Sequence, residues 1–185
     1  GFRAVPVAIL GGHEKVVSLL LTANPALIHT RDYDDESVLH QASIGGHEGV
    51  VTQLLAVEPS LIHAVDWAGM TVLHYAAIKG HENMVSHLLA VNHNLIHVAD
   101  IEYGRTALHW AAFREQEKVA ARLLAASPDL IHAVDHEGQT ALHTAAYIGA
   151  AKVLTLLARA DPKALTATVT ADDRTALHIA IDSRD

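Results

Sequence analysis

The strongest constraint on this chain is an internal repeat. The dipeptide Leu-His occurs five times, and its copies begin at Leu39, Leu73, Leu108, Leu142 and Leu177, which are 34 or 35 residues apart. Gly-His-Glu and Leu-Ile-His recur with the same period, and four of the five prolines share one phase of it. Several motifs locked to one period of this length indicate a protein that stacks copies of one supersecondary unit.

One full unit, from Asp66 to Ala99, predicts a turn followed by two helices. The unit opens on a turn-rich stretch, and Thr71 is suited to cap a short helix that runs to Ile78. Gly80 breaks that helix. A second helix is expected over about Glu82–Val91, because apolar residues recur there at helical spacing on one face.

Neither helix of a unit is long enough to be stable alone in water. Half of the 185 residues are apolar, so each unit has more apolar surface than it can bury by itself. Paired alanines in the first helix of successive units allow these helices to approach closely. The sequence therefore predicts an elongated all-α solenoid with one turn or finger per unit.

The repeated pattern resembles the ankyrin repeat over essentially the whole chain. It reads Thr-x-Leu-His-x-Ala-Ala, then Gly-His, a Val-x-x-Leu-Leu helix and an Asp-x-x-Gly turn. The resemblance implies paired short antiparallel helices with a β-turn finger in each repeat. Three features depart from the family: Val or Ala replaces the proline of Thr-Pro-Leu-His, the stretch after the second helix is one residue longer, and Glu115 replaces an inter-helix glycine. The fingers near Ile101 to Tyr103 and near Thr168 to Asp173 carry one further residue each.

The period divides the chain into one ankyrin-type domain, residues 1–185, with four complete repeats between two partial ones. The complete repeats are predicted at 32–65, 66–99, 100–134 and 135–169, and the partial repeats at 1–31 and 170–185. The first partial repeat lacks the polar outer face that a terminal repeat normally carries. We therefore expect the chain to be a segment of a longer protein.

Composition disfavours several classes of partner. The formal net charge is −8, which disfavours binding to nucleic acid. No apolar run approaches ~18 residues, so no membrane insertion is expected. The chain has no cysteine, which excludes disulfides and thiol catalysis, and it shows no signal peptide. These features predict a cytoplasmic or other reducing intracellular compartment.

The fifteen histidines raise the question of a metal site. Twelve of them fall on repeat positions, where adjacent repeats would hold them ~8–10 Å apart, too far to share one zinc ion. They are therefore interpreted as structural, and the best remaining cluster is His87, His93 and His97. The acidic run at 32–36 lacks the full calcium-loop pattern, and no Gly-x-Ser-x-Gly elbow or phosphate loop occurs. No enzyme activity, catalytic residue, metal or cofactor is predicted.

The resemblance implies that finger tips and the exposed end of each first helix grip a partner. Five of the eight aromatic residues fall at those positions, and interfaces favour aromatic and arginine side chains. For each ring the alternative is packing against a neighbouring finger. The predicted partner-binding residues are Tyr33, Ile44, Trp67, Met70, Ile78, Lys79, Tyr103, Arg105, Phe113, Arg114, His136 and Tyr147.

The sequence thus predicts a non-enzymatic scaffold that binds a protein or peptide on its concave finger and first-helix face, as a monomer. An alternative is a regulatory or targeting segment of a larger enzyme, channel or secreted effector whose activity lies outside this chain. A third hypothesis, an autonomous metal-dependent hydrolase, would require a metal site.

Overall fold

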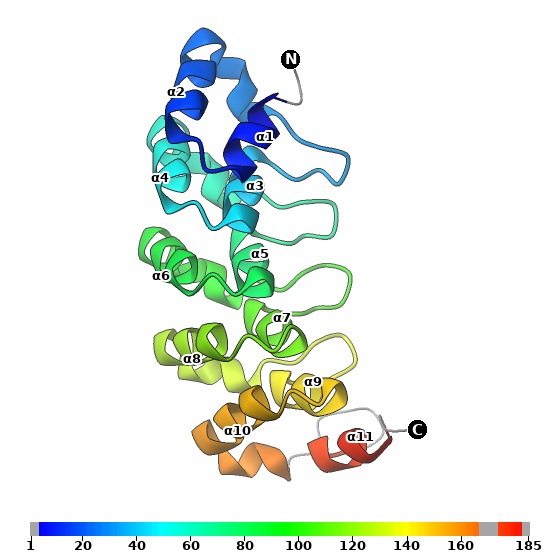
Figure 1. Cartoon of the computed structure of the whole chain (residues 1–185). Helices are drawn as coiled ribbons and strands as arrows, with labels where there is room; N and C mark the ends of the chain where they lie inside the picture. The colour runs from blue at the N-terminus through cyan, green and yellow to red at the C-terminus, as the bar shows by residue number, and fades with distance from the viewer. Residues whose placement is uncertain (1–3, 167–173, 183–185) are drawn as a thin grey trace.

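The computed structural model describes residues 4–166 and 174–182, and over these it is a stack of short helix pairs (Figure 1). The first helices of the pairs are α1 (Ala4–Leu10), α3 (Val38–Gly45), α5 (Val72–Lys79), α7 (Ala107–Phe113), α9 (Ala141–Ile148) and α11 (Ala176–Asp182). The second helices are α2 (Glu14–Ala23), α4 (Glu48–Val57), α6 (Glu82–Val91), α8 (Glu117–Ala126) and α10 (Ala151–Ala160). The architecture confirms the predicted all-α solenoid.

The local signals in the sequence set the helix ends. Thr71 caps α5 as predicted, and the helix ends at Lys79, one residue later than expected. Gly80 follows with φ 76°, a left-handed conformation that glycine adopts without steric cost. After α7 the corresponding turn is made by Glu115, whose φ is 57°. The departure noted in the sequence therefore places a side chain with a Cβ where the other turns have glycine.

A short 3₁₀ helix follows each second helix, which the sequence analysis did not predict. Proline begins four of these helices, where its missing N–H costs nothing. In four of them the side chain of the residue before the helix accepts a bond from a backbone N–H two residues on, as Asn24 does from Ala26. The helices are η1 (Pro25–His29), η2 (Pro59–His63), η3 (His93–His97), η4 (Pro128–His132) and η5 (Pro162–Leu165).

Between each 3₁₀ helix and the next first helix the chain forms a finger. We number four fingers in chain order, at residues 30–37, 64–71, 98–106 and 133–140; the one near Thr168 to Asp173, with its extra residue, lies outside the described residues. Antiparallel bridges such as Val65 with Thr71 close the base of the first three. Figure 1 shows the fingers projecting side by side from the row of first helices, opposite the second helices. Backbone bonds join adjacent fingers, for example from the Ile101 N–H to the Ala68 carbonyl at 2.8 Å.

The core is continuous from repeat to repeat. The leucines of the Leu-His dipeptides at 39, 73, 108 and 142 are fully buried, and so are second-helix leucines such as Leu54 and Leu88. The paired alanines of the first helices are buried as well, for example Ala76 and Ala77, which is consistent with close approach between neighbouring helices. Each repeat thus buries the apolar face of the next. Within the described residues no helix is both long and apolar enough to cross a bilayer.

The Leu-His histidines connect each repeat to the next finger. The Thr71 N–H donates to Nδ1 of His74 at 2.9 Å, and Nε2 of His74 donates to the Arg105 carbonyl at 3.1 Å. His40 makes the same bonds to Ser37 and Met70, and His109 to Thr106 and Gln139. A backbone N–H can only donate and a carbonyl can only accept, so each ring is neutral with its proton on Nε2. These bonds confirm the structural interpretation of His40, His74 and His109.

Candidate functional site

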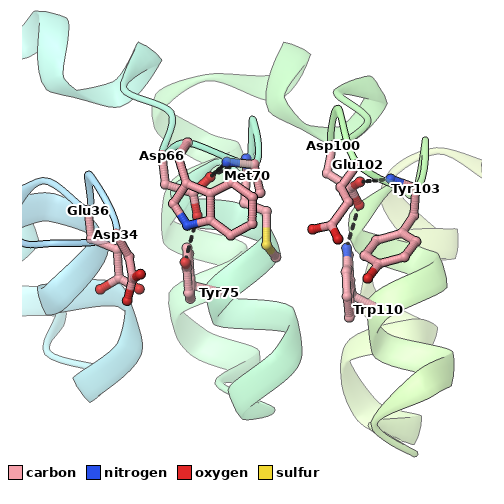
Figure 2. A pocket seen from close by; sticks show the side chains of 11 residues that line it. Asp34, Glu36, Asp66, Met70, Tyr75, Asp100, Glu102, Tyr103 and Trp110 are labelled. Carbon is pink, nitrogen blue, oxygen red and sulfur yellow. Dashed lines mark hydrogen bonds between the residues drawn. The ribbon is translucent and has the colours of Figure 1, made fainter.

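A groove of about 270 Å³ lies across the first three fingers and the helices behind them (Figure 2). The first finger contributes two carboxylates, the second finger one carboxylate and an aromatic ring, and the third finger two carboxylates and an aromatic ring. Tyr75 of α5 and Trp110 of α7 form part of its wall. The lining residues are Asp34, Glu36, Asp66, Trp67, Ala68, Met70, Tyr75, Asp100, Glu102, Tyr103 and Trp110.

A recurring arrangement turns the aromatic side chain of the first helix towards the finger. Asp66 accepts backbone N–H bonds from Ala68 and Met70 through Oδ1, which shapes the second finger. Its other oxygen, Oδ2, accepts from the Tyr75 hydroxyl at 2.7 Å (Figure 2). In the third finger, Oδ2 of Asp100 accepts from the indole Nε1 of Trp110 at 2.8 Å. Both aspartates are buried, so these bonds satisfy carboxylates that would otherwise be costly to desolvate.

The other three carboxylates are not tied into a finger in this way. Asp34 and Glu102 are exposed and Glu36 is half-buried, and none of the residues that line the groove is a lysine or arginine. Burial raises the pKa of the Glu36 carboxyl, a hydrogen bond with Tyr75 opposes that rise, and the nearby charges of Asp32 and Asp34 add to it. The groove is therefore negatively charged, and its own carboxylates repel one another.

The next step of the stack, between the third and fourth fingers, is closed by the chain itself. Arg105 occupies the same finger position as Met70, just before the capping threonine. Its guanidinium carbon lies 4.9, 5.6 and 5.5 Å from the ring centroids of Tyr103, Trp110 and Phe113. Its Nε is 3.5 Å from Oδ2 of the buried Asp135. A cation thus stacks on aromatic rings and pairs with a finger aspartate at this step.

Six of the sequence-predicted binding residues lie in these two neighbouring regions. Trp67 and Tyr103 line the groove with 63% and 43% of their surface exposed. Met70 also lines it but is only 8% exposed, so it forms part of the groove wall instead of a free contact. Arg105 and Phe113 are half-buried in the ring cluster, and the guanidinium of the exposed Arg114 lies 5.5 Å from the Phe113 ring.

The other six do not belong to the groove lining. Tyr33 is fully exposed and borders a separate hollow between α1 and the first finger. His136 is exposed on the fourth finger, and its backbone N–H donates to the Tyr103 carbonyl. The remaining four lie towards the ends of first helices. Ile44 and Ile78 are half-buried there, and Lys79 and Tyr147 are exposed.

Eight lining residues were missing from the predicted set: Ala68, Tyr75, Trp110 and the five carboxylates of the groove. The signal for the two rings lies in the repeat phase directly after Leu-His, which holds Gln41, Tyr75 and Trp110. Each has a donor that reaches the finger aspartate of its own repeat, and Gln41 Nε2 donates to Asp32 at 2.8 Å. A donor-bearing side chain at this phase therefore indicates a residue turned towards the fingers.

The histidine cluster raised by the sequence is not brought together as a metal site. His93 and His97 are exposed on η3, whereas His87 of α6 lies 3.4 Å from the Thr52 hydroxyl. Over residues 4–166 and 174–182, no three side chains of the metal-ligating types are placed to hold one ion.

Comparison with known families agrees with the geometry. The family model for ankyrin repeats in three copies matches residues 39–132, half of the chain, and a model for ankyrin repeats in many copies matches residues 108–158. The chain therefore belongs to the ankyrin repeat family, whose repeats are in general protein–protein interaction modules. No curated protein matches the chain.

Proposed function

We propose that this chain is a non-enzymatic scaffold that binds a protein or peptide on the concave face made by its fingers and first helices. The observation that carries the proposal is Trp67, an indole with 63% of its surface exposed at the tip of the second finger, beside the groove. Tryptophan is among the residues most enriched at the energetic centres of protein interfaces. A large ring held out in this way has contact area to offer to a partner.

The rigidity of the fingers supports the same proposal. The Trp67 N–H approaches the Asp34 carbonyl of the first finger at 3.5 Å, and Ile101 and His136 link the next fingers. His40 of α3 bonds to the second finger and His74 of α5 to the third, so each finger is tied to the first helix of the preceding repeat. A surface that is already ordered loses little conformational entropy when it binds, so little of the favourable interaction free energy is offset by ordering.

The test is a comparison of Trp67→Ala with a matched control. Leu19→Ala removes an apolar side chain of similar exposure from the second helix α2, away from the fingers. A partner captured on the wild-type chain is purified, and its affinity for each variant is measured beside thermal melts. We expect Trp67→Ala to weaken binding by about 2 kcal/mol, roughly thirtyfold, with little change in melting temperature.

The proposal is wrong if Trp67→Ala binds normally but melts much lower, because the ring would then serve packing. It is also wrong if Leu19→Ala loses affinity to the same extent, since the partner would then contact the second-helix face.

A further inference from the structure

The groove between the fingers has a composition that selects one kind of partner group. Its lining combines five carboxylates with four aromatic rings and contains no lysine or arginine. We propose that this groove receives the side chain of an arginine from the bound protein or peptide. The inference rests on the proposed function and specifies what the concave face recognises.

The chain itself shows how a guanidinium fits between two of its fingers. One step further along, Arg105 lies against Tyr103 and Trp110 and pairs with Asp135. Tyr103 and Trp110 also line the groove, where Met70 stands in place of an arginine. Beyond these two rings the groove offers Trp67 and Tyr75 and the same kind of carboxylate, with Met70 at the position where the neighbouring step has its own cation.

The two arginines nearest the groove, Arg31 and Arg105, bind other groups of the chain. Nη1 of Arg31 donates to the carbonyls of Asp35 and Val65 at 2.6 and 2.8 Å and pairs with the Asp35 carboxylate at 3.2 Å. Arg105 is directed to Asp135. Glu36 accepts a hydrogen bond from the Gln41 side chain, but neither Glu36 nor Glu102 has a cationic partner among the ion pairs of the described residues. Figure 2 shows the two carboxylates on opposite sides of Tyr75.

Shape and chemistry favour arginine over other cationic groups. A guanidinium is planar, stacks on aromatic faces and binds carboxylates through paired donors, whereas an ammonium is a compact and strongly hydrated charge. A volume of about 270 Å³ is below the range of about 300–1,000 Å³ typical of small-molecule sites and suits one side chain.

The test uses the full chain and three capped five-residue peptides. The first has arginine at its three inner positions, the second has lysine there, and the third has citrulline, which keeps the shape of arginine without its charge. Binding is followed by NMR through the indole N–H signals of Trp67 and Trp110 as each peptide is added. We expect saturable shifts with the arginine peptide, and binding at least about fivefold weaker for the lysine and citrulline peptides.

A double variant locates the site. Glu36→Gln with Glu102→Gln should weaken the arginine peptide by about fivefold or more. The control, Glu48→Gln with Glu117→Gln, makes the same change in net charge at exposed positions on second helices and should bind as the wild type does. Thermal melts of both variants verify that they fold.

Three results would each overturn the inference: no saturable binding of the arginine peptide, equal binding of the lysine or citrulline peptide, or equal loss in both double variants. The proposed function is judged separately by Trp67→Ala and the captured partner. If that partner needs Trp67 but is indifferent to Glu36 and Glu102, the scaffold stands and the arginine site fails. If the peptide binds as expected but the partner ignores Trp67, the reverse holds.

Discussion

The second finger with α5 and the third finger with α7 follow the same plan, although the third finger is one residue longer, and three of the exchanges between them bear on the groove and its flanking turn. Met70 is replaced by Arg105, Tyr75 by Trp110 and Gly80 by Glu115. The first exchange has the largest consequence, because Arg105 closes the step to the fourth finger with a cation while Met70 leaves the step before it acidic. A single position therefore decides whether a step of this stack carries an internal cation or an acidic groove.

Both regions contain the buried histidine of the Leu-His dipeptide, His74 in α5 and His109 in α7. Losing such a histidine should have the largest effect on stability. Burial lowers the pKa of the His74 imidazole to about 4, from an ordinary value near 6.5. The unfolded chain then binds the proton more tightly, so the stability contribution is complete above pH 6.5 and is lost as pH falls towards 4. The pH-dependent contribution of His74 to the free energy of unfolding is about 3 kcal/mol, and about 2 kcal/mol of it is lost by pH 5.

Urea unfolding at pH 7 and pH 5 measures this effect in the wild type and in His74→Gln. The variant should lose about 2 kcal/mol less than the wild type between the two values. The raised pKa of Glu36 acts in the opposite direction, since its protonation stabilises the folded state, but it is common to both proteins and cancels in the comparison. Equal losses in the two proteins would contradict the assignment of a buried neutral His74.

Arg105→Met makes the third finger like the second. We expect a loss of about 2 kcal/mol in the free energy of unfolding, because the buried Asp135 loses its cation and the three rings lose theirs. The value lies below the ~3–5 kcal/mol of a fully buried pair because the Arg105 side chain is partly exposed and its bond is long.

The matched control for Arg105 is Arg114→Met, which removes an exposed guanidinium from the same Phe113 ring. It should cost no more than about 0.5–1 kcal/mol in the same chemical denaturation experiment. If the two variants proved equally stable, Arg105 would not be the residue that distinguishes the two steps.

Glu115→Gly gives the turn after α7 the glycine that the turn after α5 has, and it should have the smallest effect on stability. Glu115 has φ 57°, a left-handed conformation that costs a residue with a Cβ ~1 kcal/mol. Glycine should therefore raise the stability by about 1 kcal/mol, reduced by its greater freedom in the unfolded chain. The same change at Glu117, the first residue of α8, serves as the control and should lower the melting temperature slightly instead, because it removes a carboxylate that favours the helix N-terminus.

Much of the fold could be predicted because its signals are local. The capping threonine, the glycine after the first helix and the apolar face over Glu82–Val91 all act within a few residues, and α5 and α6 follow them closely. The repeat then predicts stacking, because short helices with excess apolar surface must cover one another. The 3₁₀ helices escaped prediction because proline marks the end of an α-helix without specifying the conformation of the residues after it.

The candidate site depends on contacts that no single repeat contains. The sequence alone determined the period, the helices, the finger positions and the placement of aromatic residues at the phase of Trp67 and Tyr103. Only the tertiary structure decided that Met70 is buried, that Tyr75 and Trp110 turn towards the fingers, and that Arg105 is paired with Asp135. The reason is physical: burial and charge in the groove arise where fingers about 34 residues apart in the chain come side by side, so they are properties of the stack and not of any one repeat.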